Sequence, residues 1–133
     1  MPSIANEIAE FERPFKKPYL IIIGGETTVT LIGKEKGYGG RNQELCLAAA
    51  LKLKPDKKIT VLCLGTDGTD GPTKYAGGIV DQTTAQYASK LGIDLELELK
   101  RHNSSKVLSK LNGAILTDNT GTNLVNIILI CID

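Results

Sequence analysis

The sequence lacks a charge excess and a long apolar run, and each absence narrows what the protein can do. Sixteen Lys and Arg residues stand against 15 Asp and Glu residues among 133, a net charge of +1. This balance argues against binding to nucleic acid or to an acidic membrane surface. The apolar stretches 20–23, 45–51 and 127–132 are far shorter than the ~20 residues of a membrane-spanning helix. We therefore expect neither nucleic acid nor a membrane as a partner.

The sequence is also poor in cysteine and histidine. The N-terminus shows no basic region followed by an apolar segment, so no secretory signal is visible. Cys46, Cys63 and Cys131 form no C-x-x-C pair and lie in apolar runs, so we interpret them as buried, reduced thiols of a cytoplasmic protein. The one histidine, His102, lies in a polar stretch and is interpreted as a surface residue. A histidine-based triad or metal site therefore has no basis.

The length predicts one domain, with an N-terminal helix and lead-in over 1–17 and a core over 18–133. Strands are expected at 19–23, 29–32, 59–64 and 124–132, and helices at 3–13, 42–53, 82–91 and 104–111. The segment 95–99 fits either a short strand or a helical turn. Alternation of apolar strands with helices predicts an α/β fold in three layers: a mixed, largely buried sheet with helices on both faces.

Local signals refine these elements. Ser3 is expected to cap the first helix, and Thr83 and Gln86 have the spacing of a capping box. The segment 45–51 is apolar on all sides, which predicts burial on more than one side of its helix. Either a partner covers it, such as a second domain or another copy of the chain, or it lies between the sheet and the N-terminal helix.

Glycine is more abundant than usual, and its positions indicate where function lies. Twelve of the 14 glycines fall within 24–40, within 65–78 or at Gly121. Glycine is favoured where the backbone turns sharply or approaches another group closely. Loops in these windows are therefore the candidate binding loops, including 33–40, which is rich in Gly and Lys.

The first loop leads through Gly39 and Gly40 into a helix that starts with Arg41. Backbone N–H groups at a helix start favour anions, whereas a cation there costs ~0.3–1 kcal/mol. Arg41 is therefore expected to pair either with a ligand phosphate or carboxylate, or with Glu44 or a nearby Asp. A dinucleotide fingerprint fails because Asn42 stands where it requires glycine, and no phosphate-binding P-loop sequence occurs.

Polar residues follow two further predicted strands. Asp67 and Asp70 could orient a hydroxyl group or hold hydrated Mg²⁺, or could instead form Asx turns with their own backbone. The loop 117–123 offers hydroxyl and amide groups for phosphate or sugar, or is a solvated turn. Glu26, at the end of the strand 19–23, could bind a ligand hydroxyl or brace the first loop through Arg41.

Four motifs occur in one order: GGETTV at 24–29, GGRNQE at 39–44, GTDGTDGPT at 65–73 and TGTN at 120–123. In this combination the chain, from about residue 18 onwards, resembles the MOFRL domain. That domain is the C-terminal domain of the glycerate 2-kinase family, some members of which are labelled hydroxypyruvate reductase. The third polar loop departs from the family pattern: Asp118 and Asn119 replace Gly and Pro, and Asn126 replaces an acid.

The resemblance implies ATP- and Mg²⁺-dependent phosphorylation of D-glycerate at its 2-hydroxyl, in a cleft between this domain and a larger N-terminal domain. It implies catalytic roles for Arg41 and Asp67, and Asp67 and Asp70 are the candidate metal ligands. The expected substrate- or phosphate-binding residues are Glu26, Thr27, Gly39, Gly40, Asn42, Thr66, Gly68, Asp70, Thr120, Thr122 and Asn123.

The chain is accordingly expected to supply half of a kinase site and to be inactive without an N-terminal kinase domain or subunit. A free-standing binding or assembly module without catalysis is the alternative. A hydroxypyruvate reductase is a third hypothesis, and it needs a nicotinamide site that the sequence does not show.

Overall fold

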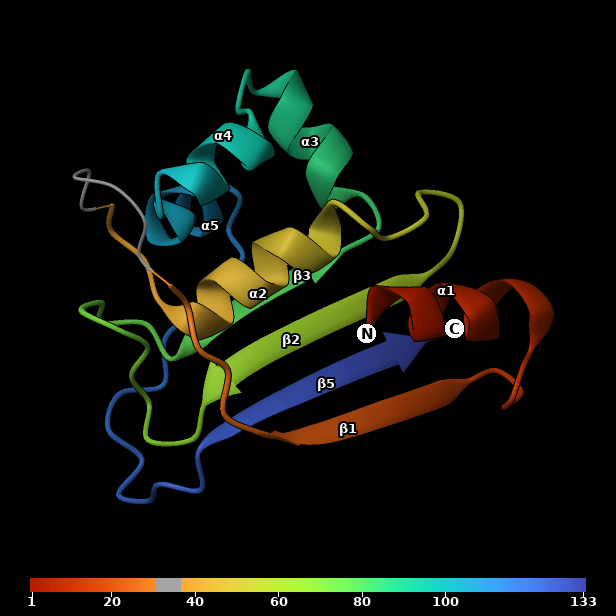
Figure 1. Ribbon diagram of the computed structural model, residues 1–133, viewed down its shortest axis with the longest axis horizontal. Coiled ribbons are helices and arrows are strands. Elements are labelled where there is room, and N and C mark those ends of the chain that lie inside the picture. Colours follow the sequence, from red (N-terminus) through yellow and green to blue (C-terminus); the bar gives the residue numbers. More distant parts are fainter. Residues whose placement is uncertain (31–36) are drawn as a thin grey trace.

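The computed structural model describes residues 1–30 and 37–133. The described part is α/β, as expected (Figure 1). Its helices are α1 (Pro2–Phe11), α2 (Arg41–Ala50), α3 (Thr84–Lys90), α4 (Leu95–Lys100) and α5 (Ser104–Lys110). Its strands are β1 (Tyr19–Gly25), β2 (Ile59–Gly65), β3 (Gly77–Asp81), β4 (Ala114–Ile115) and β5 (Asn126–Ile132).

The strands form one sheet in the order β1-β5-β2-β3-β4. Each described pairing is antiparallel, which corrects the expectation of a mixed sheet. The physical reason is the place of the last strand: β5 lies between β1 and β2 and runs opposite to both. The row Ile21–Ile130–Val61–Val80 shows the register across four strands.

The two faces of the sheet differ in burial. On one face every second residue of β2 and β5 is buried, and α1 and α2 pack against these strands (Figure 1). On the other face Leu20, Ile22 and Ile79 are 50%, 66% and 39% exposed. Within the residues described, the packed helices therefore lie on one face, which corrects the expected three layers and the largely buried sheet. Aliphatic residues on both faces of β1 made this exposed edge strand look buried.

α2 begins one residue earlier than predicted and ends three residues earlier. Its apolar segment is buried between β2 and β3 on one side and α4 and α5 on the other. Helices of the chain itself therefore cover it, although not the N-terminal helix, since α1 packs on β2 and β5. Cys46 and Cys63 are buried free thiols, and burial raises the pKa of Cys46 well above its usual value. Cys131 is exposed, because it lies on the open face of the sheet.

Helix ends show where local signals failed. Ser3 lies inside α1, which has Pro2 in its first turn and no side-chain cap. Thr83 precedes α3 but makes no capping hydrogen bond, because Asp81 accepts from the backbone N–H of Thr83 instead. α5 ends in a left-handed turn: Gly113 N–H donates to Leu108 O, with Asn112 in the left-handed region.

Three other segments differ from expectation or resolve it. Residues 95–99 belong to a helix, α4, because Asp94 accepts a hydrogen bond from Leu97 N–H at its start. Strand β3 was not predicted, since its two glycines weaken the strand pattern. Of the strand expected at 29–32, Val29 and Thr30 are not in a strand, and the rest lies outside the described residues, as does the first half of the loop 33–40.

Candidate functional site

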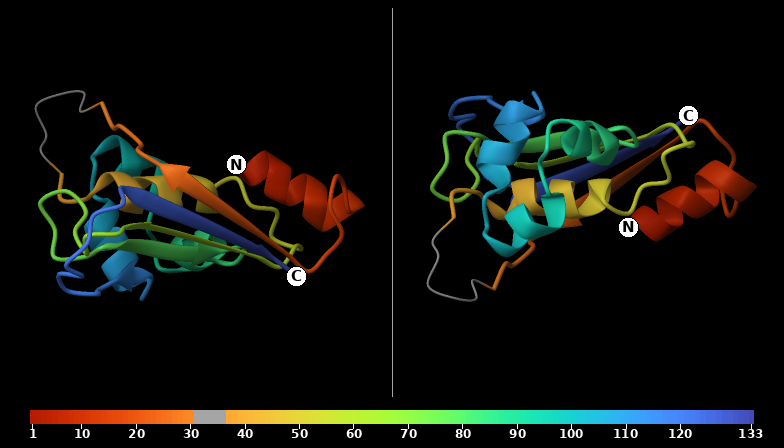
Figure 2. Two further views of the ribbon diagram at one scale, coloured as in Figure 1. Left: turned by 90° about the horizontal axis from the view of Figure 1, so that it is seen from below. Right: turned by 90° about the horizontal axis from the view of Figure 1, so that it is seen from above.

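Three strand ends lie side by side, and the candidate binding loops extend from them. Gly25 of β1, Asn126 of β5 and Gly65 of β2 occupy one row of the register. The segments 26–30, 66–76 and 116–125 therefore meet at one end of the sheet, opposite α1 (Figures 1 and 2). α2 begins at this same end (Figure 1).

Asp70 caps the start of α2 from a distant part of the chain. Its Oδ1 accepts from the backbone N–H and the side-chain amide of Asn42, both at 3.1 Å. Its Oδ2 accepts from the backbone N–H of Gln43 at 2.9 Å and from its side-chain amide at 3.0 Å. Asp70 is 2% exposed. The carboxylate thus satisfies helix N–H groups that a ligand anion would otherwise take, and in this structure Asp70 and Asn42 are bonded to the protein itself.

The amides of this cluster form a buried polar network. Asn42 Nδ2 also donates to Asn126 Oδ1 at 3.1 Å, and Gln43 Nε2 donates to Thr73 Oγ1 at 3.0 Å. Asn42, Gln43 and Asn126 are each at most 1% exposed. Asn42 Oδ1, Gln43 Oε1 and Asn126 Nδ2 have no hydrogen-bond partner among the described residues, so the network is satisfied only in part. The bonds that it does make are directional and hold these side chains in one arrangement. The network therefore holds the residues that flank it, above all Arg41.

Arg41 lies at the surface of this network and is paired. Its Nη1 contacts Glu26 Oε1 at 2.5 Å, and its Nη2 donates to Asn126 Oδ1 at 3.5 Å. Of the alternatives for Glu26 and Arg41, bracing of the loop by this pair is the one observed. Both side chains are about half exposed, at 40% and 58%, and exposed ion pairs stabilise little. The guanidinium can therefore exchange Glu26 for a ligand anion at small cost.

A cavity of about 400 Å³ opens beside Arg41. Its size is within the range of pockets for small molecules. Its lining residues are Thr27, Thr28, Val29, Gly39, Gly40, Arg41, Glu44, Gly71 and Pro72. Four of the predicted site residues, Thr27, Gly39, Gly40 and Arg41, are thus brought together. The buried Thr27 Oγ1 has no hydrogen-bond partner among the described residues.

The second predicted catalytic residue, Asp67, does not line this cavity. Its Oδ1 accepts from Thr69 N–H at 3.0 Å, which is the Asx turn that the sequence left open. Thr66 Oγ1 donates to Val125 O at 2.9 Å, and Thr120 Oγ1 donates to Thr66 O. A Cβ at Gly68 would lie 1.9 Å from Asp118 O. Thr66, Asp67, Gly68 and Thr120 therefore form a second cluster, in which loop 65–69 packs on loop 117–120.

The last two predicted binding residues are exposed and bonded only locally. Thr122 N–H donates to Thr120 Oγ1 at 3.4 Å, and Asn123 Oδ1 accepts from Val125 N–H at 3.1 Å. Neither residue lines the cavity beside Arg41. Thr122 and Asn123 therefore belong to a solvated turn in this structure.

Two residues of the cavity region were missed as a pair. His102 Nδ1 lies 2.9 Å from Glu44 Oε1, and their side chains are 14% and 15% exposed. The interpretation of His102 as a surface residue was wrong, because the turn between α4 and α5 packs against the start of α2. Glu44 was considered only as a partner of Arg41, which precedes it by three residues on the same helix face.

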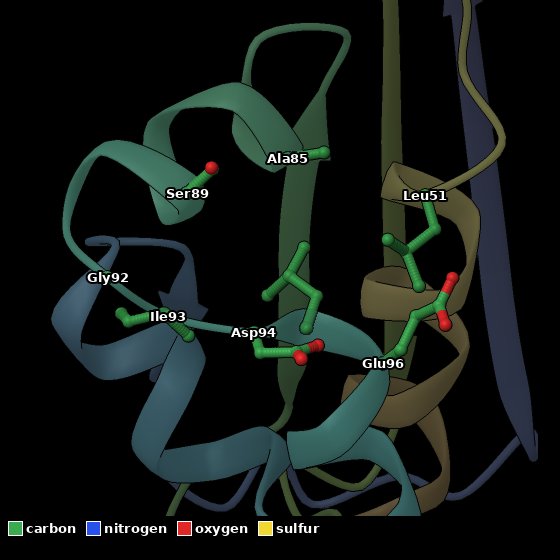
Figure 3. A pocket seen from close by; sticks show the side chains of 8 residues that line it. Leu51, Ala85, Ser89, Gly92, Ile93, Asp94 and Glu96 are labelled. Atoms are coloured by element: carbon green, nitrogen blue, oxygen red, sulfur yellow. The ribbon is translucent and has the colours of Figure 1, made fainter.

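A larger cavity, of about 550 Å³, lies elsewhere. It is lined by residues of α3, α4 and the segment between them, and by Leu51 after α2 (Figure 3). None of the predicted site residues lines it. Its size alone therefore does not make it the site, because the polar groups converge at the other cavity.

The residues fit Mg²⁺ only in part. Asp70 is unsuited, since both of its oxygens accept N–H groups. Asp67 has one oxygen bonded to a backbone N–H and could join substrate oxygens around the ion, as Mg²⁺ sites with one carboxylate do. In residues 1–30 and 37–133, no group of three His, Cys, Asp or Glu side chains is arranged to hold a metal. No helix in these same ranges is long and apolar enough to cross a membrane.

Comparisons with known proteins identify relatives of this arrangement. Residues 19–126 match the family model described as the MOFRL family. The chain is 52% identical over 127 residues to a glycerate 2-kinase of Pyrococcus horikoshii and covers 96% of its own length and 28% of that protein. It is 45% identical over 127 residues to a D-glycerate 2-kinase of Thermotoga maritima, of which it covers 30%. A protein of Agrobacterium vitis, 35% identical over 114 residues, carries a provisional hydroxypyruvate reductase name.

A solved structure agrees with the sequence relatives. The crystal structure of a glycerate kinase from Thermotoga maritima superposes with a TM-score of 0.94 at 44% identity. The match covers 99% of this chain and 31% of that one. The chain therefore spans less than a third of the length of these relatives.

Proposed function

Because the chain belongs to the MOFRL family, we propose that it forms the C-terminal part of an ATP-dependent glycerate 2-kinase. The observation that carries the proposal is the cavity in which Arg41 lies beside the glycine loop and the start of α2. Phosphoryl transfer is catalysed mainly by positioning and by stabilising negative charge. A guanidinium that donates through one Nη to the buried Asn126 and through the other to the exposed carboxylate of Glu26 suits this task.

In this proposal, Arg41 exchanges Glu26 for the carboxylate of glycerate or for the phosphoryl group in transfer. The hydrogen bond from Nη2 to Asn126 and the network around Asp70 keep the guanidinium in place during the exchange. ATP and Mg²⁺ supply the phosphoryl group and neutralise its charge when bound. Asp67 is the carboxylate that would contact the ion or accept a hydroxyl proton, although it does not line the cavity beside Arg41.

The relatives are more than three times as long as the region that they share with this chain. In the proposal, the remaining, larger part forms the other wall of the site and contributes to nucleotide binding. The chain by itself is then expected to lack turnover. An N-terminal kinase domain, on the same or another chain, is the proposed partner.

A chimera tests the proposal. This chain replaces the matching segment of the Pyrococcus horikoshii glycerate 2-kinase, to which it is 52% identical. We expect ATP-dependent phosphorylation of D-glycerate by the chimera, measured as ADP release, and none by the chain alone. Arg41→Ala in the chimera should lower kcat by ~100-fold, and Arg41→Lys should recover little of it.

Three results would contradict the proposal. Turnover by the isolated chain would show that no partner is needed. A folded but inactive chimera that binds neither glycerate nor Mg-ATP in calorimetry would favour a non-catalytic module. Oxidation of NADH that depends on hydroxypyruvate and on Arg41 would instead favour a reductase.

A further inference from the structure

The contact between Glu44 and His102 joins two elements that are far apart in the sequence. Glu44 lies in the first turn of α2, whereas His102 lies between α4 and α5 in the left-handed region, at φ 55°. The 2.9 Å between Nδ1 and Oε1 is hydrogen-bond distance, and both side chains are largely buried. A carboxylate at this depth needs a donor, and the imidazole supplies it.

The backbone around His102 is fixed by the glycine loop. A Cβ at Gly37 would lie 2.4 Å from the carbonyl oxygen of His102, and one at Gly39 would lie 3.0 Å from the same atom. A side chain at either glycine would therefore force the loop away from this turn. The wall of the cavity and the position of the imidazole are thus set by one close contact.

Glu44 lines the same cavity as Arg41 but does not pair with it. Arg41 contacts Glu26, and Glu44 Oε1 contacts His102. Within the part of the chain that the structure describes, Glu44 Oε2 takes no hydrogen bond. The cavity therefore presents a cation with an exchangeable partner and, one helical turn away, a carboxylate oxygen with an unused acceptor.

We infer that Glu44 binds a hydroxyl group of the ligand while Arg41 binds its anionic group, so that the cavity selects a hydroxy acid. His102 is a positioning residue: its Nδ1–H donates to Oε1 and leaves Oε2 for the ligand. A plain carboxylic acid would satisfy Arg41 but leave Glu44 Oε2 without a donor, which disfavours such a ligand. This inference rests on the proposed function only for the identity of the hydroxy acid, D-glycerate.

The pair can be tested on the chain itself, because His102 is its one histidine. Long-range ¹H–¹⁵N spectra of the histidine-labelled chain should show a proton on Nδ1 above pH 8, where free imidazole prefers Nε2–H. Glu44→Ala should shift this preference to Nε2–H. A wild-type histidine with an unprotonated Nδ1 would overturn the positioning role.

Kinetics of the chimera test the ligand contact. Glu44→Ala should raise KM for D-glycerate at least tenfold and change KM for ATP less than twofold. His102→Ala should raise the same KM several-fold, and His102→Asn should restore it, because the Asn amide places an N–H close to where Nδ1–H lies. Glu96→Ala, an exposed first-turn acid of α4 outside this cavity, is the matched control and should change neither constant.

The outcomes separate this inference from the proposed function. An active chimera in which Glu44→Ala leaves KM for glycerate unchanged overturns the inference alone. If the chimera is inactive, the proposed function fails, and titration of the isolated chain decides the inference. The inference is supported if D-glycerate shifts the His102 signals saturably, if Glu44→Ala abolishes this shift, and if propionate does not produce it. The inference is overturned if D-glycerate causes no shift. Unfolding midpoints of the variants confirm that they fold.

Discussion

The two halves of α2 are buried by opposite means. In the first turn the buried side chains are polar, Asn42 and Gln43, and their partner is the buried carboxylate of Asp70. From Cys46 to Ala50 the buried side chains are apolar and pack on β2 and β3. One helix thus carries a polar anchor at the site end and an apolar anchor at the other.

The difference shows what each half contributes. Apolar burial is non-directional, so the second half fixes α2 on the sheet but would tolerate small shifts. Hydrogen bonds are directional, so the bonds from Asn42 and Gln43 to the carboxylate of Asp70 hold the first half in one arrangement. Arg41 and Glu44, which reach the cavity, both lie in that first turn. Precision at the site is therefore expected to depend on Asp70 more than on the apolar contacts.

The largest effect on stability is expected from Asp70→Ala. It leaves the backbone and side-chain N–H groups of Asn42 and Gln43 without their acceptor, and we expect a loss of about 3–5 kcal/mol in the free energy of unfolding. Urea unfolding measures it. Asp67→Ala is the control, since Asp67 accepts one N–H in a local turn, and it should cost less than about 1 kcal/mol. Equal losses in the free energy of unfolding would mean that the hydrogen bonds of Asp70 stabilise the protein no more than the local turn of Asp67 does.

Leu47→Ala probes the apolar half at a side chain that is 0% exposed. The cavity left behind should cost about 3 kcal/mol in the same measurement. Ala48→Ser, one position along at an exposed site, should change stability by no more than about 0.5 kcal/mol. The two variants should also differ in their effect on substrate binding. Leu47→Ala should leave the KM of the chimera for glycerate nearly unchanged, whereas Asp70→Ala should raise it. A similar KM change in both would refute the separation of the two anchors.

The same contrast explains what could be predicted from the sequence. The apolar half of α2 and the strands β2 and β5 are visible as apolar runs, and the loops at the site were found from their glycines and motifs. The polar half was visible only as a resemblance, because the partners of Asn42 and Gln43 lie some 28 residues along the chain, at Asp70. No local pattern reports such a contact.

Two errors have the same origin. The contact of His102 with Glu44 spans 58 residues, so a lone histidine in a polar stretch gave no sign of it. The open face of β1 carries aliphatic side chains, Leu20 and Ile22, that are indistinguishable in sequence from buried ones. Which strand lies at an edge follows from the order of strands, and that order depends on where β5 inserts.

Gly40→Ala should have an intermediate effect. The added Cβ would lie 2.3 Å from the carboxyl carbon of Asp70, so the polar anchor has to shift although the backbone of Gly40, at φ −135°, accepts alanine. We expect a loss of about 2 kcal/mol by urea unfolding, as for overpacking. Gly24→Ala is the matched control, because its Cβ meets nothing within 4 Å, and it should cost less than about 0.5 kcal/mol. If Gly40→Ala left the free energy of unfolding unchanged, Asp70 and its hydrogen-bond partners would have to shift at little cost.

The smallest effect is expected at the start of α3, where the partly buried Asp81 is a local counterpart of Asp70. Burial alone would raise the pKa of Asp81, but hydrogen bonds from Thr83 and Thr84 outweigh it and lower the pKa below its ordinary value of 3.8. A depressed folded-state pKa stabilises the protein above the unfolded-state pKa, and this contribution is lost as pH falls through the folded-state value. Asp81→Asn should therefore cost about 0.5 kcal/mol near neutral pH, and this cost should shrink as the pH falls below 3.8, measured by urea unfolding across pH. Since the bonds of Asp81 are local and solvated, a cost as large as that of Asp70→Ala would remove the distinction between the two caps.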